Sequence, residues 1–343
     1  MKIQLDFSSI TIENAILKIE SSTIEEDWLE ECLIFLKSYK NQTEFTLKTS
    51  GTTGEKKKIK VLKEQMVFSA SATLQYFNLK PSHKVFLSLS TNYVAGKMMI
   101  VRAIIGKLNL TLAPPSTSPS KYISEKYDFA PFVPMQMLDL LESGKIKNFD
   151  KILIGGGNVD NRLLNSLANF ETAIFESFGT TETLTHFAIK RLLPKKENYF
   201  KTLPGFTVKT NSNNELILNK NQLIKESFCT KDLITLKSES EFQWIGRSDH
   251  LINSGGVKII PEEVEKKIQQ HIKIPFVIVG LIDEKFGEIV VLVSEGKPIK
   301  RLKNTTLNIS KYELPKKYFV LNEFPRTESG KIKRKQISQL IKT

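Results

Sequence analysis

Short apolar segments that alternate with helix-like segments restrict the fold of this chain more than any other feature. The apolar segments 84–89 (KVFLSL), 151–154 (KILI) and 172–175 (TAIF) are each followed by turn residues, which is typical of buried strands. Segments 63–77 and 133–141 have the spacing of helices. This alternation predicts an α/β fold, in which a largely parallel sheet is covered by helices on both faces.

The pattern changes in the second half of the chain. Segments 215–218 (ELIL), 233–236 and 242–245 (FQWI) read as antiparallel strands joined by polar turns. These strands predict a small β subdomain attached to the large α/β domain.

A new unit follows this subdomain. A helix is expected at 261–270, because a proline and acidic residues open it, and strands are expected at 276–282 and 288–294. We therefore expect a large N-terminal domain over 1–246 and a small, mobile α+β C-terminal domain over 247–343.

The net charge of +13 fits two classes of protein. A nucleic-acid binder would have such a charge, and so would an enzyme whose ligands are polyanions. The lysines are scattered as pairs and triplets without interleaved aromatic residues, so a platform for single-stranded nucleic acid is not indicated.

The remaining composition indicates a cytoplasmic protein without a membrane segment. No apolar run approaches the roughly 18 to 20 residues of a membrane span, and the first ten residues lack the features of a signal peptide. Cys32 and Cys229 are too few for a disulfide framework or a cysteine-based metal site, and we expect both to be small buried residues.

A loop rich in glycine and hydroxyl groups follows the apolar segment 45–47. Such a loop can direct backbone NH groups and hydroxyls toward an anion, although a flexible surface turn has the same composition. It does not match the GxxxxGK[ST] phosphate loop. The loop consists of Thr49, Ser50, Gly51, Thr52, Thr53, Gly54, Glu55, Lys56 and Lys57.

Four later motifs occur in a fixed order after this loop: 178–182 (FGTTE), 242–249 (FQWIGRSD), 253–261 (NSGGVKIIP) and 325–334 (PRTESGKIKR). Together with the loop they resemble the signature of the adenylate-forming superfamily. That superfamily includes acyl- and aryl-CoA ligases, firefly luciferase and the adenylation domains of peptide synthetases. The resemblance implies an enzyme that binds ATP, Mg²⁺ and, in the ligases, coenzyme A.

The resemblance assigns roles around the phosphates of ATP. The loop would bind them, with Lys57 as the family lysine and Lys56 in place of the usual proline. Thr181 and Glu182 match the residues that contact the phosphates and ligate magnesium, for which a carboxylate is a suitable hard ligand. Lys331 matches the lysine that assists adenylation by offsetting negative charge, although a lysine in so basic a tail is otherwise expected in solvent.

Two further positions would bind the rest of the adenylate. Gly155, Gly156 and Gly157 resemble the turn along which the acyl group and adenine lie, although a tight strand-to-helix turn would also use glycine. Asp232 matches the aspartate that accepts hydrogen bonds from the ribose hydroxyls, although an aspartate at a turn can also have a structural role.

The hinge region completes the resemblance. Arg247 resembles the arginine that contacts ribose and phosphate, and Asp249 matches the hinge about which the C-terminal domain rotates. Ser254, Gly255 and Gly256 correspond to the loop that enters the site for the thioester step, and a plain glycine turn is compatible with that role.

The substrate prediction depends on the early position of the loop and on two local stretches. Most relatives have a longer portion before the loop, and such shortness resembles the o-succinylbenzoate-CoA ligases of menaquinone biosynthesis. The stretches 93–102 and 178–191 also resemble those ligases. Because o-succinylbenzoate carries a second carboxylate, its pocket needs a cation or directed donors, for which Lys97, Arg102 and His186 are candidates. Each could instead have a structural partner.

The sequence thus predicts two half-reactions, adenylation of a small-molecule carboxylate and transfer of the acyl group to coenzyme A. Another adenylating ligase is the alternative, and an inactive nucleotide- or nucleic-acid-binding homologue is a different class. We expect no nucleic-acid or membrane partner, and a homodimer is a further hypothesis.

Overall fold

The computed structural model describes residues 2–22, 26–48, 58–157, 159, 161–302, 309–327 and 332–341; of residues 48, 58, 161, 162 and 181 it describes the backbone alone. The chain forms two compact units. Unit 1 consists of Met1–Thr207 and Asn219–Ser227, and unit 2 consists of Val208–Leu218 and Phe228–Thr343.

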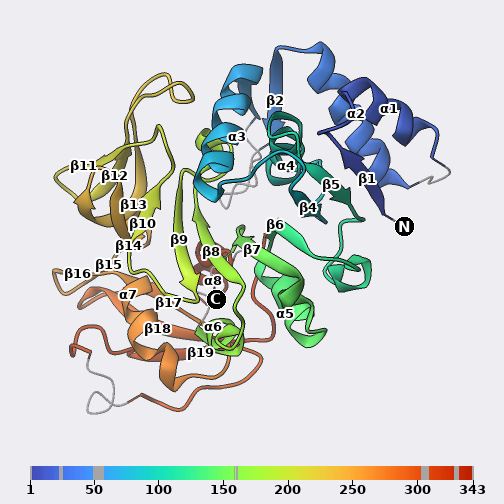
Figure 1. Cartoon of the computed structure of the whole chain (residues 1–343). Coiled ribbons are helices and arrows are strands. Elements are labelled where there is room, and N and C mark those ends of the chain that lie inside the picture. Colours follow the sequence, from blue (N-terminus) through green and yellow to red (C-terminus); the bar gives the residue numbers. More distant parts are fainter. Residues whose placement is uncertain are drawn as a thin grey trace. The chain divides into compact units, whose positions relative to one another are not determined.

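Unit 1 is built on a mixed sheet with the strand order β1-β5-β4-β6-β7-β8-β9-β10 (Figure 1). Strands β5, β4, β6, β7 and β8 are parallel, whereas β1, β9 and β10 are joined to the sheet by antiparallel pairs. The strands span Ile3–Asp6 (β1), Lys84–Leu87 (β4), Asn109–Leu112 (β5), Tyr127–Phe132 (β6), Phe149–Ile154 (β7), Ala173–Phe178 (β8), Ala188–Leu193 (β9) and Phe200–Thr202 (β10).

Helices pack on both faces of this sheet because side chains alternate along each strand. In β6, Ala130 and Phe132 belong to an apolar cluster with Met137 of α5. Phe129, on the opposite face, packs against Phe77 of α3 with ring centroids 4.9 Å apart. The helices are Ile12–Glu20 (α1), Asp27–Asn41 (α2), Lys63–Phe77 (α3), Val94–Ile105 (α4), Pro134–Glu142 (α5) and Asn161–Leu167 (α6), with short 3-10 turns at Pro119–Tyr122 (η1), Lys145–Asn148 (η2) and Thr181–Thr183 (η3).

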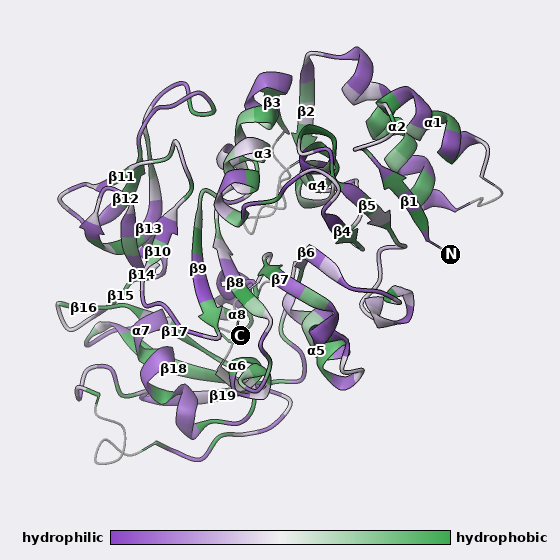
Figure 2. Ribbon diagram, viewed as in Figure 1, coloured by the Kyte–Doolittle hydropathy of each residue, from purple (hydrophilic) through white to green (hydrophobic). Residues whose placement is uncertain are grey.

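Figure 2 shows hydrophobic residues over parts of the strands β7 and β9, whereas helices such as α5 carry hydrophilic and hydrophobic residues on different sides. A separate antiparallel pair, Glu44–Lys48 (β2) and Lys58–Leu62 (β3), precedes α3. The expected phosphate loop, residues 49–57, connects these two strands.

Unit 2 contains an antiparallel sheet with the order β14-β13-β12-β11. In its longest pair, Asp232 of β13 lies opposite Arg247, the last residue of β14. The strands span Val208–Thr210 (β11), Glu215–Leu218 (β12), Phe228–Ser238 (β13) and Glu241–Arg247 (β14).

A second sheet of unit 2 has the order β16-β15-β18-β17, with β19 paired to β18. Helix α7 packs on one face through Val264 and Ile268, and helix α8 packs on the other through Ile337. The elements are Ser248–His250 (η4), Ile252–Ser254 (β15), Val257–Ile259 (β16), Pro261–Ile268 (α7), Gln269–His271 (η5), Phe276–Asp283 (β17), Gly287–Glu295 (β18), Lys317–Leu321 (β19) and Arg334–Leu340 (α8).

The predicted fold class is confirmed: an α/β part with a mostly parallel sheet, a small antiparallel part and an α+β part are all present. The division into domains 1–246 and 247–343 stays a prediction, and the compact units group the antiparallel strands with the C-terminal elements. Cys32 is buried as expected, but the expectation for Cys229 was wrong, because its strand places it at the surface.

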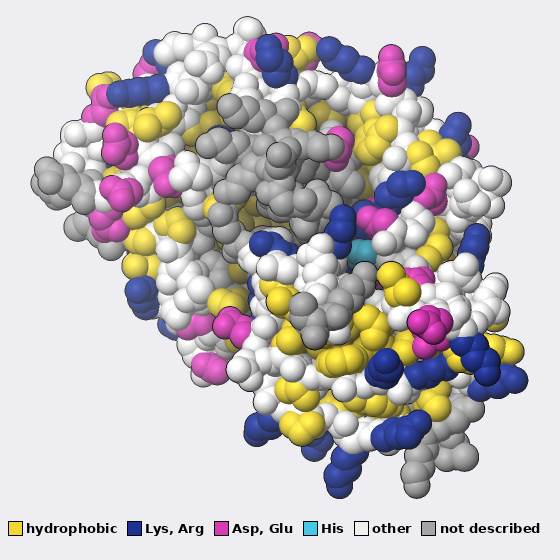
Figure 3. All heavy atoms as spheres, turned by 180° about the vertical axis from the view of Figure 1, so that it is seen from behind, with side chains coloured by type: hydrophobic (Ala, Val, Ile, Leu, Met, Phe, Trp, Pro, Cys, Tyr) yellow, Lys and Arg dark blue, Asp and Glu magenta, His cyan; other side chains and the backbone are white. Residues whose placement is uncertain are grey.

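On the face shown in Figure 3, lysine and arginine side chains stand in several groups between acidic and apolar ones. In the part of the chain that the structure describes, every helix is too short or too polar to cross a bilayer.

Candidate active site

The loop that follows β8 is folded tightly back on itself. A Cβ at Gly179 would lie 1.8 Å from the carbonyl oxygen of Thr185, so only glycine fits there. The fully buried Thr183 closes the loop, since its Oγ1 accepts a hydrogen bond from the Thr180 amide at 2.9 Å. Glu182 lies in the same turn and is exposed to solvent. The backbone of the neighbouring Thr181 belongs to this turn.

Arg102 lies beneath this loop with only 2% of its surface exposed. Its Nη2 donates a hydrogen bond to Oγ1 of Thr185 at 2.9 Å. Its Nε has no hydrogen-bond partner, and no carboxylate among the described residues forms an ion pair with it. Burial lowers the pKa of Arg102 to about 10, which still leaves it charged at neutral pH. Arg102 is therefore a buried cation without a counter-charge in the described part of the chain.

His186 lies beside this cation and is also buried. Its Nε2 is 3.2 Å from Oγ1 of Thr73, a residue of α3. Burial lowers the pKa of His186 well below its ordinary value, and the charge of Arg102 lowers it further. His186 is therefore neutral and offers directed hydrogen bonds without charge. Thr73, Arg102, Thr185 and His186 together are called the buried cation cluster below.

Lys97 has other partners, although it lies on the same helix as Arg102. Its Nζ donates to the carbonyl oxygen of Thr91 and lies 5.6 Å from the centre of the Phe35 ring. Of the three predicted substrate residues, the structure thus brings Arg102 and His186 together and gives Lys97 a separate environment.

The glycine turn 155–157 lies at the carboxyl end of β7. The amide of Gly155 donates to the carbonyl oxygen of Phe132, at the end of β6, with a distance of 3.0 Å. A Cβ at Gly155 would lie 2.9 Å from Oγ of Ser177 in β8, and Gly156 has a φ of 79°. The turn and the loop after β8 therefore both lie at the carboxyl edge of the parallel strands, where open α/β sheets bind ligands.

In unit 2, Asp232 and Arg247 form a second polar group. Oδ1 of the buried Asp232 accepts a hydrogen bond from the indole Nε1 of Trp244 at 3.0 Å and lies 3.6 Å from Nη1 of Arg247. Within the described ranges, Oδ2 of Asp232 makes no hydrogen bond. Its capacity to accept hydrogen bonds is therefore unused by the described residues.

Arg247 also forms two parallel hydrogen bonds with Asp249, of 2.9 and 3.0 Å. Partial burial alone would lower the pKa of Arg247, but the hydrogen bonds to Asp249 and the charges of Asp232, Asp249 and Glu262 raise it. Arg247 is consequently a fixed cation directly before the predicted hinge at Asp249.

The predicted thioester loop is a turn between β15 and β16. Ser254 is buried, whereas Gly255 and Gly256 have φ values of 62° and 82°. The Gly255 amide donates to the carbonyl oxygen of Phe286 at 2.8 Å, and a Cβ at Gly256 would meet no atom within 4 Å. The turn thus needs glycine for its backbone conformation and presents an open surface at Gly256.

Several predicted residues lie outside the described part of the chain. They are Lys331 and the loop residues Thr49, Ser50, Gly51, Thr52, Thr53, Gly54, Lys56 and Lys57.

The described residues contain no group of three His, Cys, Asp or Glu side chains that could hold a metal ion by themselves. Glu182 is a suitable single ligand for Mg²⁺, because its carboxylate is exposed and magnesium commonly takes one or two carboxylates together with phosphate oxygens and water.

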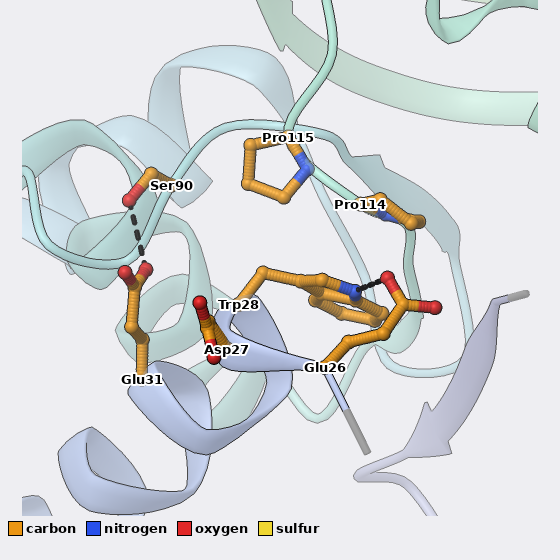
Figure 4. Close-up of a pocket in the computed structure, with 7 residues that line it drawn as sticks. All are labelled: Glu26, Asp27, Trp28, Glu31, Ser90, Pro114 and Pro115. Atoms are coloured by element: carbon orange, nitrogen blue, oxygen red, sulfur yellow. Dashed lines mark hydrogen bonds between the residues drawn. The ribbon is translucent and has the colours of Figure 1, made fainter. Parts of the chain in front are cut away.

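A hollow of about 580 Å³ lies elsewhere in unit 1 (Figure 4). Its lining residues are Glu26, Asp27, Trp28, Glu31, Ser90, Pro114 and Pro115. Glu26 accepts a hydrogen bond from Trp28, and Glu31 accepts one from Ser90. Because three carboxylates line this hollow and no predicted site residue does, it is unsuited to an anionic ligand.

The sequence did not indicate Thr73, Thr185 or Trp244 as members of the site. Thr185 precedes His186 directly, so its proximity could have been noticed. Thr73 comes from a helix more than a hundred residues earlier, and Trp244 reaches Asp232 only through the pairing of β13 with β14. Such contacts depend on tertiary structure.

Comparison with known proteins identifies a matching family and a related ligase. Residues 37–216 match the family model described as AMP-binding enzyme. A 2-succinylbenzoate–CoA ligase of Staphylococcus epidermidis is 26% identical over 326 residues, with 84% of this chain and 68% of that protein covered.

Two solved structures are similar as well. The acyl-CoA synthetase (AMP-forming)/AMP-acid ligase II-like protein from Dyadobacter fermentans is 28% identical with a TM-score of 0.67, over 99% of this chain and 100% of that one. The o-succinylbenzoate coenzyme A synthetase from Bacillus subtilis, in complex with ATP and magnesium ion, has a TM-score of 0.73 at 20% identity, over 97% of this chain and 82% of that one. At 20% identity, the similarity to the Bacillus subtilis structure shows a common fold.

Proposed function

Because the chain belongs to the family of AMP-binding enzymes, we propose that it joins o-succinylbenzoate to coenzyme A at the expense of ATP. In the first half-reaction a carboxylate oxygen of the acid attacks the α-phosphorus of ATP, and pyrophosphate leaves with the electrons of the broken P–O bond. In the second, the thiolate of coenzyme A attacks the acyl carbon and AMP leaves. The product is a thioester.

The buried cation cluster is the observation that supports a substrate with two carboxylates. Arg102 is charged, buried and without a carboxylate partner among the described residues, an arrangement that is costly for the empty protein. A carboxylate of the substrate would offset this cost. One carboxylate of o-succinylbenzoate is activated, and the second is available for this contact.

Thr185 defines where the second carboxylate would bind in the buried cation cluster. Its oxygen accepts the hydrogen bond from Arg102, so its own hydroxyl hydrogen can be donated to an anion. Thr185 is only partly buried, whereas Arg102 lies deeper. In this proposal the second carboxylate binds at Thr185 with Arg102 behind it. The neutral His186 forms the wall next to it.

The resemblance to the adenylate-forming superfamily assigns parts of the nucleotide to predicted residues of each unit, taken separately. In unit 2, Oδ2 of Asp232 would accept hydrogen bonds from the ribose hydroxyls, and Arg247 would contact ribose and phosphate. In unit 1, the glycine turn 155–157 would lie along the adenine and acyl group. The phosphates would be bound by the loop 49–57 and by Thr181.

In this proposal, Mg²⁺ and Lys331 together offset the negative charge at the phosphates of ATP. Mg²⁺ would offset the charge of the phosphate oxygens when it is bound with ATP, and Glu182 would hold it. Lys331 would offset the charge that builds up as the carboxylate attacks. After adenylation the C-terminal part would rotate at Asp249, so that the loop Ser254, Gly255 and Gly256 replaces Lys331 at the acyl group.

A panel of carboxylic acids assayed for pyrophosphate release tests this proposal. We expect o-succinylbenzoate to be activated far better than benzoate, which has the aryl carboxylate but lacks the succinyl one. Equal activity with both acids would refute the substrate assignment and leave the adenylating activity intact. Absence of pyrophosphate release with every acid would refute both.

A further inference from the structure

Glu262, in the first turn of α7, touches the chain on both sides of the predicted hinge. After the hinge, Nδ1 of His250 lies 2.5 Å from Oε1 of Glu262. Before the hinge, a Cβ added to Gly246 would lie 2.7 Å from Oε2 of Glu262 and 2.4 Å from Cγ2 of Ile260. One side chain therefore packs against residues that precede and follow Asp249.

The surroundings of Glu262 keep its carboxylate charged. Only 9% of its side chain is exposed, and Oε2 is buried without a hydrogen-bond partner among the described residues. Burial alone would raise the pKa of Glu262, but the hydrogen bond from His250 and the charge of Arg334 lower it below its ordinary value. Glu262 in turn raises the pKa of Arg247 through its charge, although Asp249 contributes more. The carboxylate is thus coupled to cations on both sides of the hinge.

Arg334 extends this contact to the last helix. Its guanidinium forms two hydrogen bonds with Glu265 of α7, of 2.7 and 2.5 Å, and a third with the carbonyl oxygen of Ile278 at 2.8 Å. Its Nε lies 3.7 Å from Oε1 of Glu262. Arg334 is the first residue of α8 and follows Lys331 by three positions. Helix α7 therefore holds helix α8 in place, and α8 begins three residues after the predicted adenylation lysine, Lys331.

A rotation at Asp249 would separate these contacts into two groups. His250, Glu262 and Arg334 all follow the hinge and would move together. Gly246 and Arg247 precede it, so the packing of Glu262 on Gly246 and its attraction to Arg247 would be lost or changed. The described arrangement is consequently one that Glu262 stabilises against rotation.

We propose that Glu262 is a positioning residue of the hinge, which holds one orientation of the C-terminal part and thereby sets the balance between the two half-reactions. This inference rests on the proposed function, since it requires that adenylation and thioester formation use different orientations. Glu262 contacts no reacting group in this account. It acts through Gly246, Arg247 and His250.

Each half-reaction is measured separately to test this role. Pyrophosphate release in a single turnover reports adenylation, and AMP release from supplied acyl-adenylate on addition of coenzyme A reports thioester formation. For Glu262→Ala we expect the ratio of the two rates to change by at least about fivefold, with one rate lowered and the other unchanged or raised. Glu262→Gln, which keeps the size but loses the charge, should change the ratio in the same direction by less.

Glu263→Gln is the matched control, because Glu263 lies in the same helical turn but is exposed. It removes the same charge from α7 and should leave the ratio unchanged. Gly246→Ala tests the packing from the opposite side: its Cβ would displace Glu262 and Ile260, while the φ of Gly246 needs no glycine. This variant should shift the ratio in the same direction as Glu262→Ala.

Thermal unfolding of each variant shows whether it is folded. A proportional loss of both rates in folded Glu262→Ala and Gly246→Ala would overturn the positioning role, and so would an unchanged ratio. These outcomes differ from failure of the proposed function, in which the unmodified protein releases no pyrophosphate from any carboxylate.

Discussion

Replacement of Arg102 by methionine should stabilise the protein and at the same time weaken its selectivity for a dicarboxylate. Each pKa unit corresponds to about 1.4 kcal/mol, so the lowering of the Arg102 pKa to about 10, from the ordinary value of an arginine, represents roughly 3 kcal/mol of destabilisation by the charged form. At neutral pH the group is charged in both the folded and the unfolded protein, so this cost is fully present; it is relieved only as the pH rises above the pKa of the folded state. Methionine removes the charge and fills most of the same space.

The substitution also removes the hydrogen bond from Arg102 to Thr185, which contributes about 1 kcal/mol. The net expectation is a gain of roughly 2 kcal/mol in the free energy of unfolding, measured by urea denaturation without substrate. The KM for o-succinylbenzoate should rise about tenfold to a hundredfold, because a charge-assisted contact to its second carboxylate is lost. Activity with benzoate should not change.

Lys97→Met is the control on the same helix. Its ammonium group already contacts the carbonyl oxygen of Thr91 and the ring of Phe35, so the ratio of activities with the two acids should stay as in the unmodified protein. The reasoning would be refuted if Arg102→Met were less stable than the unmodified protein and retained its preference for o-succinylbenzoate. A lost preference in Lys97→Met together with an intact one in Arg102→Met would assign the second carboxylate to Lys97.

Three further outcomes are expected. Lys331→Ala should abolish pyrophosphate release and spare thioester formation from supplied acyl-adenylate; equal loss of both steps would contradict its assigned role. Gly179→Ala should cost roughly 2 to 4 kcal/mol in unfolding experiments and lower activity, because the new Cβ would meet the Thr185 carbonyl oxygen at 1.8 Å, and an equally stable variant would disprove that geometry. Hydrogen bonds from Ser248 and other neighbours lower the pKa of Glu215 to about 2, so its stabilising effect should be present above pH 4.5 and vanish as the pH falls toward 2. Unfolding of the unmodified protein and Glu215→Gln at pH 6 and pH 3 measures this, and a difference that is the same at both pH values would contradict it.

The fold was largely predictable because local pattern and tertiary structure agree. The helix expected at 63–77 is α3, Lys63–Phe77, and the apolar segment 151–154 is the second half of β7. Strand β6 was not indicated, and its sequence explains why: Pro131 lies within it, and proline normally argues against a strand in the middle of a sheet. Its neighbours β4 and β7 hold it there by parallel pairing.

The site was predictable only in part. Motif order indicated Glu182, Asp232 and Arg247, because each stands in a local sequence with a recognisable pattern. The sequence could not separate Lys97 from Arg102, which lie five residues apart on α4, since their partners come from distant elements. The position of Glu262 against Gly246 has the same origin, because it depends on how α7 packs on β14.

Three arginines in this chain differ in a way that bears on function. Arg334 is partly buried and forms hydrogen bonds with Glu265, and the partly buried Arg326 forms two with Glu295, of 2.5 and 2.7 Å. Both charges are balanced by carboxylates of the chain itself, so both arginines are explained by the structure that they hold together. Arg102 is buried more deeply than either, with 2% of its surface exposed, yet its neighbours are the hydroxyl of Thr185 and the neutral ring of His186. A buried charge that the described part of the chain leaves unbalanced is stabilised by an approaching anion, so Arg102 supports the proposed contact with a substrate carboxylate, whereas Arg334 is accounted for by its bonds to Glu265.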